Sequence, residues 1–319
     1  MKIVGIGSYL PEGILSNDDL AQLVDTNDEW VFSRAGIRSR HLVKDENTSD
    51  LATAAARAAL EDAGIQIEDV EVIVVATSTA DFFVPGVAYQ VLKSLGLSKA
   101  MVFDINAACT GFVYAMDVVT SLMMARGFKY GLVIGAEVMS KIIDWNDRNT
   151  CVLFGDGAGA VVLENTAKNQ VLYTKCTAIP DVDDALGTGG IAVSNPLYAG
   201  IQDDYYVQMK GQDVFKFAVR VLEESVSEAL AEMDIQVDDV DYYVFHQANS
   251  RILDYVAKKL RIPNEKYHST IANTGNTSAA SIPIVLDEMN RAGVLKRGMK
   301  VMLAGFGAGL AYGTMSIEW

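Results

Sequence analysis

One cysteine lies where a nucleophilic thiol would be expected. Cys109 follows the apolar run 101–105 and a short turn of small residues, and a segment with helical apolar spacing, 110–126, begins directly after it. The first turn of a helix leaves backbone N–H groups unpaired, so it favours a thiolate and offers donors to an oxyanion. This position therefore predicts a nucleophile with a lowered pKa. The alternative is a buried structural thiol, which is how we interpret Cys151 and Cys176.

A histidine and an asparagine in the second half of the chain are further candidates. His246 follows the strand-like run 242–245, and sites in parallel sheets form at the carboxyl ends of strands. Asn276 precedes the apolar helical segment 281–289, and a shift of 167 residues makes it the counterpart of Cys109. The alternatives are a core histidine bonded to a backbone carbonyl and an asparagine that caps a helix. The functional interpretation places both side chains in the cleft of Cys109.

Two glycine-rich loops, 155–159 (GDGAG) and 305–309 (GFGAG), resemble phosphate-binding loops. Each runs into a strand-like segment instead of a helix, so the signal for dinucleotide binding is weak. We interpret these glycines as residues that let the backbone approach a substrate or a catalytic side chain.

Cations and one tryptophan indicate a binding surface. Trp30 and Arg34 lie in DEWVFSRAGIRSR and are residue types typical of stacking sites, although a core tryptophan beside a surface arginine is the alternative. Arg251, Lys258 and Lys259 share one face of a predicted helix. Such a face is ordinarily just solvated, but it is more notable in a chain with a formal net charge of −15.

Alternating strand and helix signals must position these residues. Apolar and β-branched runs predict strands at 3–7, 71–77, 101–105, 129–134, 160–163, 242–245 and 311–317. Helical spacing, caps and glycine stops predict helices at 18–24, 48–64, 110–126 and 281–289. The alternation indicates an α/β protein with a mostly parallel sheet covered by helices.

The chain also contains internal echoes. Residues 60–75 and 230–245 align without a gap at an offset of 170, and six of these 16 positions are identical, where unrelated segments would share roughly one. A second echo joins the two glycine-rich loops. Generic helix–turn–strand composition is the alternative explanation. We predict two similar α/β halves, 1–168 and 169–319, packed as one unit without a linker.

Composition excludes several classes of protein. With 319 residues the chain has room for about two domains, and 50% hydrophobic and 21% charged residues suit a globular core. Because 41 acidic residues outweigh 26 basic ones, nucleic acid and anionic membranes are poor partners. Three cysteines and three histidines predict neither a disulfide framework nor a zinc site. No signal peptide or membrane span is predicted, so a cytoplasmic location is expected.

Six motifs together resemble one known family. In chain order they read DTNDEW, AACTGFVYA, FGDGAGAVVL, HQANSR, NTGNTSAASIP and GFGAG, and they are similar to those of β-ketoacyl-acyl-carrier-protein synthase III. The likeness runs from about Gly5 to Trp319. It implies the thiolase-like fold, with two similar α/β halves in a five-layered αβαβα arrangement. It also implies a homodimer in which loop 81–87 reaches the partner's pocket.

The resemblance implies an activity that needs no cofactor or metal. A short acyl-CoA, such as acetyl-CoA, would condense with malonyl-acyl-carrier protein to give 3-oxoacyl-acyl-carrier protein, CoA and CO₂. Cys109 would carry the acyl group, and His246 and Asn276 would donate hydrogen bonds to the malonyl thioester oxygen. An oxyanion hole would use Cys109, Gly307 and Ala308. Ala308 departs from the family, in which glycine is common at this position.

The resemblance implies three further groups of residues. CoA would be bound by Trp30, Arg34, Arg148, Gly211, Gln212, Phe215 and Asn249. The acidic carrier protein would be bound by Lys216, Gln247, Ala248, Asn249, Ser250, Arg251, Lys258 and Lys259. The acyl group would be enclosed by Met139, Phe154, Leu186, Val207 and Phe306. Gln212 departs from the family, in which asparagine is common.

The chemistry of these residues agrees with decarboxylative condensation. Loss of CO₂ generates the carbanion equivalent, so two donors to the enolate oxygen suffice and no strong base is needed. A His–Asn pair without a carboxylate is less consistent with a hydrolase triad, and the GFGAG loop lacks the second cysteine of the thiolase branch. Two alternatives remain. One is another condensing enzyme, 3-hydroxy-3-methylglutaryl-CoA-synthase-like or polyketide-type, and the other is a catalytically silent acyl-binding paralogue.

Overall fold

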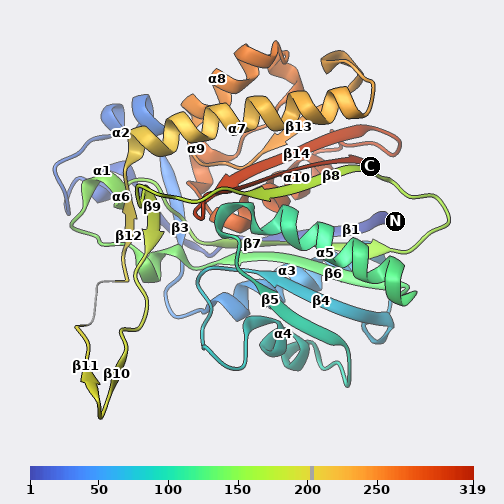
Figure 1. Ribbon diagram of the computed structural model, residues 1–319, viewed down its shortest axis with the longest axis horizontal. Helices are drawn as coiled ribbons and strands as arrows, with labels where there is room; N and C mark the ends of the chain where they lie inside the picture. Colours follow the sequence, from blue (N-terminus) through green and yellow to red (C-terminus); the bar gives the residue numbers. More distant parts are fainter. Residues whose placement is uncertain (202–204) are drawn as a thin grey trace.

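The computed structural model describes residues 1–201 and 205–319. Figure 1 shows two β-sheets stacked on one another, with helices between them and on both outer faces. The first sheet, in the order β1-β7-β6-β4-β5, contains β1 (Lys2–Tyr9), β4 (Val70–Ala76), β5 (Met101–Ile105), β6 (Tyr130–Glu137) and β7 (Gly157–Glu164). The second, in the order β13-β14-β15-β8, contains β8 (Val171–Ala178), β13 (Tyr242–Phe245), β14 (Lys300–Gly307) and β15 (Ala311–Glu318).

Helices form the other three layers. Between the sheets lie α5 (Gly111–Arg126) and α10 (Ser281–Arg291), whose buried residues share one hydrophobic core with both sheets. The outer face of the first sheet packs against α3 (Thr48–Ala63) and α4 (Val87–Leu95). The outer face of the second packs against α7 (Gly211–Glu232) and α8 (Ser250–Leu260). The predicted αβαβα arrangement is therefore confirmed.

Both sheets are mixed, so the prediction of a mostly parallel sheet is wrong. β4 runs parallel to β5 and β6, and β13 runs parallel to β14, but β7 is antiparallel to both β1 and β6. β15 is likewise antiparallel to β14 and β8. Only a short turn joins β14 to β15, whereas a parallel neighbour requires a crossover of a dozen or more residues. The alternation of helix and strand signals does not reveal strand direction.

From η1 to the end of β6, elements of the first half recur in the second half at an offset of 170 residues. The short 3-10 helices η1 (Ile67–Asp69) and η4 (Val237–Asp239) correspond, as do η2 (Ala108–Thr110) and η6 (Ser278–Ala280). Because η1 and η4 lie within the first sequence echo, that echo is also a structural one. Beyond it, β6 and β14 correspond from end to end. The glycine echo is not, because Gly157 begins β7 whereas Gly307 ends β14.

Most predicted elements differ from the structure by a few residues at most. β5 and β13 have the predicted bounds, and Gly64, with a φ of 64°, ends α3. One helix is clearly shorter than predicted, because α1 covers Asn17–Leu20 instead of 18–24. Leu20 is fully buried whereas Leu23 is 59% exposed, and Val24 is only partly buried, so the segment after the first turn is less firmly packed.

α5 is the apolar centre of the fold. By length and composition alone, the segment Ala108–Arg126 qualifies as a membrane span, although the sequence predicts none. Half of this segment is buried inside the protein, and Phe112 and Met116 have no exposed surface. Its apolar composition therefore follows from its place between two sheets.

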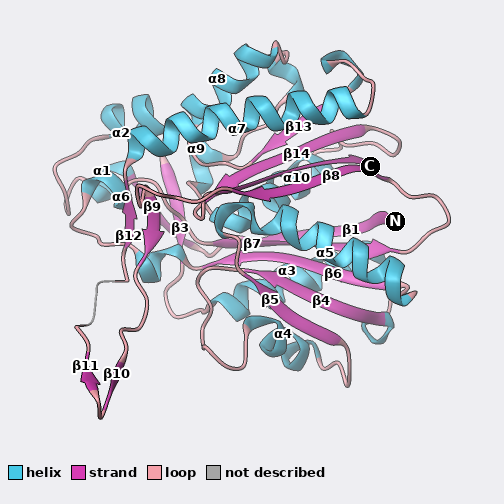
Figure 2. Ribbon diagram, viewed as in Figure 1, coloured by secondary structure: helices cyan, strands magenta, loops and turns pink. Residues whose placement is uncertain are grey.

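Shorter elements close one end of the layers. They are β2 (Gly13–Ser16), α2 (Asp28–Ala35), β3 (Ser39–Leu42), η3 (Met139–Ile142), α6 (Arg148–Cys151), β9 (Leu186–Thr188), β12 (Val207–Met209) and α9 (Ile271–Thr274). A separate hydrophobic cluster around Val31, Ile37 and Phe154 holds them together. β10 (Ser194–Asn195) and β11 (Tyr198–Ala199) form a hairpin that projects from the body (Figure 2), and η5 (Asn264–Lys266) follows α8.

Candidate active site

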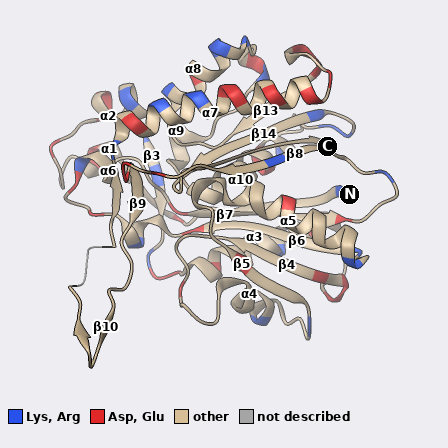
Figure 3. Ribbon diagram, viewed as in Figure 1, with Lys and Arg blue, Asp and Glu red and all other residues tan. Residues whose placement is uncertain are grey.

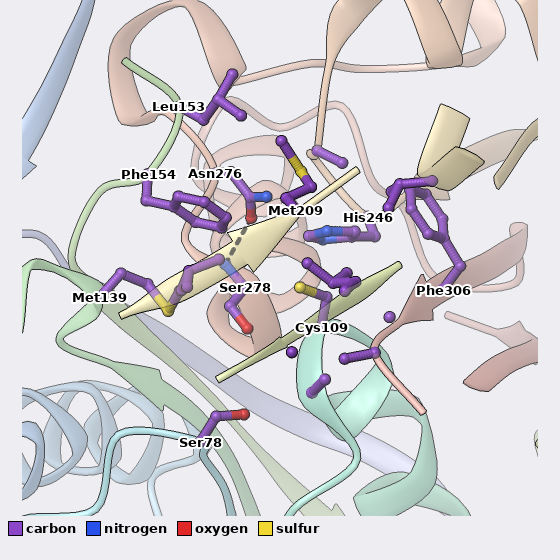
Figure 4. Close-up of a pocket in the computed structure, with 18 of the residues that line it drawn as sticks. Ser78, Cys109, Met139, Leu153, Phe154, Met209, His246, Asn276, Ser278 and Phe306 are labelled. Carbon is purple, nitrogen blue, oxygen red and sulfur yellow. Dashed lines mark hydrogen bonds between the residues drawn. The ribbon is translucent and has the colours of Figure 1, made fainter. Parts of the chain in front are cut away.

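A cavity of about 400 Å³ lies at the beginnings of the two central helices. Cys109 comes from η2, directly before α5, while Asn276 comes from the segment before α10. His246 directly follows β13. Figure 4 shows the three side chains around the same space. The structure therefore brings the three candidate catalytic residues together from three separate segments of the chain.

The thiol of Cys109 is surrounded by protein. Burial raises the pKa of Cys109 to about 12, a hydrogen bond with Ser278 opposes this shift, and the nearby charge of Glu137 adds to it. The prediction of a lowered thiol pKa is therefore wrong, because desolvation outweighs the favourable position ahead of α5. Cys151 and Cys176 are also free thiols, and burial raises the pKa of each.

His246 is a buried, neutral imidazole with one unpaired nitrogen. Its Nδ1 lies 2.7 Å from Oγ of Ser281, and its backbone N–H donates to the carbonyl of Ala304 at 2.9 Å. Its Nε2 has no hydrogen-bond partner among the described residues. Burial lowers the pKa of His246 to about 3, so the ring is uncharged at neutral pH. Such a ring is suited to donate or accept a proton at Nε2.

The backbone of Asn276 is locked in place. Its N–H donates to the carbonyl of Leu153 at 2.8 Å, and its carbonyl accepts the N–H of Gly155 at 3.1 Å. Its Oδ1 accepts the N–H of Ser278 at 2.9 Å, and Nδ2 has no hydrogen-bond partner in the described part of the chain. At the offset of 170, the counterpart of Asn276 is Asn106, so the prediction that it corresponds to Cys109 is wrong.

The end of β14 lies directly against the backbone of Cys109. A Cβ atom at Gly307 would stand 2.7 Å from the backbone nitrogen of Cys109, which is closer than real Cβ atoms approach. Glycine is therefore required here, in agreement with the interpretation that the glycines of this loop allow close approach of the backbone to a catalytic residue. Gly307 and Ala308 line the cavity together with Cys109, so their backbone lies at the same cavity as the thiol.

A buried carboxyl group beside the thiol is not predicted from the sequence. Glu137, at the end of β6, has no exposed surface and accepts hydrogen bonds from Oγ1 of Thr79 at 2.6 Å and Oγ of Ser278 at 3.0 Å. The backbone N–H of Ser78 and Oγ1 of Thr77 also donate to it. Burial raises the pKa of Glu137. The offset of 170, which pairs Glu137 with Gly307, is the signal that locates it.

All five residues predicted to enclose the acyl group line the cavity, namely Met139, Phe154, Leu186, Val207 and Phe306. Further apolar lining residues were not predicted: Ile142, Leu153, Met209, Val214 and Ile252. They come from short elements and helix starts, where apolar residues carry no periodic signal. The wall of the cavity is therefore mostly apolar around the polar group of Cys109, His246 and Asn276.

The residues predicted to bind CoA fall into two groups. The guanidinium groups of Arg34 and Arg148 lie 5.0 and 4.7 Å from the ring centroid of Trp30. Asn249 lines the cavity and donates from Nδ2 to the carbonyl of Arg34 at 3.0 Å, which links this cluster to the cavity mouth. Gly211 and Phe215 also line the cavity, whereas Gln212 is exposed and does not.

Most residues predicted to bind a carrier protein lie near or on α8. Figure 3 shows basic residues on α8 beside acidic residues on α7. Arg251 and Lys258 are exposed, and Lys259 is exposed and pairs with Glu223 at 3.8 Å. The other predicted residues on or near the surface are Lys216, Ala248, Asn249 and Ser250.

Gln247 is the exception in this set. It has no exposed surface, and its side chain bonds to the carbonyl of Phe245 at 2.8 Å and to Oγ of Ser269 at 2.8 Å. The prediction that Gln247 contacts a carrier protein is therefore wrong. Its amide is used inside the protein, next to His246, where it holds the chain after β13.

Two family models match the chain. The model described as 3-oxoacyl-[acyl-carrier-protein (ACP)] synthase III matches residues 103–179, which include Cys109. The model described as the C terminal of the same synthase matches residues 230–319, which include His246 and Asn276.

Relatives match over the whole chain. A β-ketoacyl-[acyl-carrier-protein] synthase III of Clostridium acetobutylicum is 43% identical, with 100% of this chain and 98% of the relative covered. The crystal structure of a 3-oxoacyl-[acyl-carrier-protein] synthase III from Aquifex aeolicus has a TM-score of 0.93 at 40% identity, with 100% of this chain and 99% of that chain covered. The priming β-ketosynthase of the R1128 polyketide biosynthetic pathway also has a TM-score of 0.93, at 32% identity, with 99% and 95% covered.

Proposed function

Because this chain belongs to the 3-oxoacyl-[acyl-carrier-protein] synthase III family, the condensing enzymes that initiate fatty-acid biosynthesis, we propose that Cys109, His246 and Asn276 carry out its two half-reactions. The chain is thus an acyltransferase that acts on an acyl-CoA and malonyl-acyl-carrier protein. The observation that carries the proposed roles is the unpartnered Nε2 of buried His246, at the same cavity as Cys109 and the free Nδ2 of Asn276.

In the first half-reaction, Sγ of Cys109 attacks the thioester carbonyl of the acyl-CoA. A new carbon–sulfur bond forms, the bond to the CoA sulfur breaks, and the departing CoA thiolate takes up the proton that the cysteine has lost. The backbone N–H groups of Cys109 and of the Gly307–Ala308 segment stabilise the oxyanion of the tetrahedral intermediate. The close contact of Gly307 with the backbone nitrogen of Cys109 supports this arrangement.

In the second half-reaction, malonyl-acyl-carrier protein binds beside the acylated cysteine. Nε2–H of His246 and Nδ2–H of Asn276 donate to its thioester oxygen, so the enolate that forms as CO₂ leaves is stabilised without a base. The enolate carbon attacks the acyl carbonyl, and the bond to Sγ of Cys109 breaks. A neutral imidazole suits this role, and burial keeps His246 neutral.

We further propose how substrates and partners bind. Trp30, Arg34 and Arg148 bind the nucleotide of CoA, while Gly211, Phe215 and Asn249 border the path of its pantetheine arm. Lys216, Ala248, Ser250, Arg251, Lys258 and Lys259 bind an acidic carrier protein. Met139, Phe154, Leu186, Val207 and Phe306 enclose the acyl group. Two halves, 1–168 and 169–319, form each subunit of a cytoplasmic homodimer.

Self-acylation tests the first half-reaction. Labelled acetyl-CoA should transfer its acyl group to the wild-type protein but not to Cys109→Ala. Cys151→Ala, at a buried thiol outside the cavity, is the control and should be acylated normally. A wild-type protein that remains unlabelled would support the alternative of a silent acyl-binding paralogue.

Product analysis tests the second half-reaction. With acetyl-CoA and malonyl-acyl-carrier protein we expect 3-oxobutyryl-acyl-carrier protein, whereas a 3-hydroxy-3-methylglutaryl-type enzyme would give no 3-oxoacyl product. A polyketide-type enzyme is a second candidate because of the similarity to the R1128 priming ketosynthase. Comparing kcat/KM for acetyl-, butyryl- and isobutyryl-CoA identifies the primer that the cavity favours.

A further inference from the structure

Ser281 makes two hydrogen bonds beside the imidazole of His246. Its Oγ lies 2.7 Å from Nδ1 of His246 and accepts the backbone N–H of Gln247 at 3.2 Å. We propose that Ser281 is a positioning residue whose hydroxyl donates to Nδ1 and thereby keeps the proton of the neutral imidazole on Nε2. This inference rests on the proposed role of His246 as a hydrogen-bond donor in condensation.

The number of hydrogen-bond donors around Oγ of Ser281 favours donation from this hydroxyl to Nδ1 of His246. A serine hydroxyl has one proton to donate and two lone pairs that accept. If Nδ1 of His246 were the donor, Oγ of Ser281 would accept twice, and its own proton would have no acceptor among the described residues. Ser281 is 1% exposed, so its hydroxyl is shielded from bulk water. An unsatisfied buried donor is costly, and the arrangement in which Ser281 donates avoids it.

The surroundings of the ring agree with a neutral donor. Nε2 has no partner among the described residues, and the ring of Phe306 meets the imidazole at 5.4 Å between centroids and an interplanar angle of 68°. Burial lowers the pKa of His246, which disfavours the imidazolium. With its tautomer set by Ser281, the imidazole presents an N–H group to the cavity.

Fixing the tautomer also limits what His246 can do in the first half-reaction. The lone pair of its neutral ring lies on Nδ1 and is occupied by the Ser281 hydroxyl. His246 therefore has no free acceptor with which to take the proton of Cys109, and it acts in condensation only.

The position of Ser281 in the fold explains how both donors are aligned together. Asn276 and Ser281 lie in one segment, which runs through η6 into the first residue of α10. The segment supplies one donor directly, as Nδ2 of Asn276, and orients the other through Ser281. A single rigid turn thus prepares the site for the enolate oxygen before substrate binds.

The tautomer can be measured directly because the chain has only three histidines. In ¹⁵N-histidine-labelled protein we expect His246 to show a protonated, pyrrole-type Nε2 and an unprotonated, pyridine-type Nδ1, with His246→Gln used to assign the signals. In Ser281→Ala we expect the proton to redistribute between the two nitrogens. A protonated Nδ1 in the wild-type protein, or an unchanged tautomer in Ser281→Ala, would overturn the proposal.

Kinetics separate this role from a purely structural one. In Ser281→Ala, acylation of Cys109 by acetyl-CoA should stay within about twofold of the wild-type rate, while condensation by pre-acylated enzyme falls by about tenfold. Ser225→Ala is the matched control, because it removes another buried hydroxyl, one that accepts from Thr314 at 2.8 Å outside the cavity. This control should leave both steps within about twofold.

The outcomes distinguish the two proposals. Equal losses in both steps of Ser281→Ala, or equal effects of the two serine variants, would contradict the positioning role of Ser281. A wild-type protein that does not condense would instead contradict the proposed function, and the nuclear magnetic resonance measurement would then still test the tautomer.

Discussion

Asn106 and Asn276 occupy equivalent positions, 170 residues apart, in the two repeats of the fold. Oδ1 of Asn106 accepts the backbone N–H of Ala108 at 3.2 Å, and Oδ1 of Asn276 accepts the backbone N–H of Ser278 at 2.9 Å. Ala108 and Ser278 both have a positive φ, 46° and 48°. The same turn therefore precedes α5 and α10, and an asparagine stabilises it in each case.

The repeat divides the catalytic residues unequally. At the same offset, Cys109 corresponds to Ala279 and His246 corresponds to Ala76. The nucleophile therefore lies in the first repeat, and the two proposed donors, His246 and Asn276, lie in the second. Asn106 also differs from Asn276 because its Oδ1 accepts a second hydrogen bond, from Oγ of Ser78 at 3.1 Å.

Replacing the two asparagines should separate catalysis from structure. Asn276→Ala removes the Nδ2 donor and should lower condensation by about 100-fold or more, while acylation of Cys109 persists. Asn106→Ala removes the acceptor of the turn before α5 and of the Ser78 hydroxyl, and it should change condensation by less than about tenfold. Single turnovers with labelled acetyl-CoA, followed by malonyl-acyl-carrier protein, measure each step. Similar losses of condensation in the two variants would contradict the donor role of Asn276.

The reactivity of Cys109 should increase steeply with pH. Because burial raises the pKa of Cys109 to about 12, the thiolate is scarce at neutral pH, and its alkylation by iodoacetamide should accelerate about tenfold per pH unit from pH 7 to 9. Cys109→Ala identifies the contribution of this thiol. A rate that levels off below pH 8 would show that the position ahead of α5 outweighs desolvation.

His246 should make the protein sensitive to acid. Burial lowers the pKa of His246 from 6.5 to about 3, so between these values the unfolded chain binds a proton that the folded chain does not. The free energy of unfolding should therefore fall as pH decreases through this window, by up to about 1.4 kcal/mol per unit from this group. His246→Gln should lose less thermal stability between pH 6.5 and 4 than the wild type. If the melting temperatures of His246→Gln and the wild type fell by the same amount between pH 6.5 and 4, this contribution of His246 would be refuted.

Much of this site can be predicted from the sequence because its residues lie at the ends of regular elements. Cys109 and His246 follow strands with clear apolar patterns, and the bounds of those strands, β5 and β13, are as predicted. The direction of the strands could not be predicted in the same way, since it depends on the length and path of the connections between them. The pattern of β14 and β15 alone does not show that they form an antiparallel hairpin.

The burial and the hydrogen-bond partners of individual side chains could not be predicted from the sequence. Burial raises the pKa of Cys109, and the hydrogen bond that opposes this shift comes from Ser278 in η6, far away in the chain. Gln247 is polar and follows a strand, as a surface residue might, yet its partners Ser269 and Thr270 bury it. Such contacts between distant segments leave no periodic signal in the sequence.

Trp30 should contribute to binding of acyl-CoA but not to chemistry. Arg34 and Arg148 hold their guanidinium groups over its ring, and none of the three residues lines the cavity that contains Cys109. Trp30→Ala should raise KM for acetyl-CoA by about tenfold with little change in kcat, since the interaction is the same in ground and transition states. Phe32→Ala, which removes another aromatic ring of α2 stacked by Arg38, is the control. A large loss of kcat for Trp30→Ala would contradict this role.

Arg251 should attract an acidic carrier protein to the cavity mouth despite the net charge of −15. It is exposed in the first turn of α8, between Asn249 and Ile252, which line the cavity, and it forms no ion pair among the described residues. Arg251→Glu should raise KM for malonyl-acyl-carrier protein by about tenfold at low salt and leave KM for acetyl-CoA nearly unchanged. Arg126→Glu, at the opposite end of α5 from Cys109, makes the same charge change far from the mouth and should have little effect. Because the attraction is screened, the difference between the two variants should shrink as salt rises. Equal effects of both variants at low salt would show that only the overall charge matters and that α8 does not bind the carrier protein.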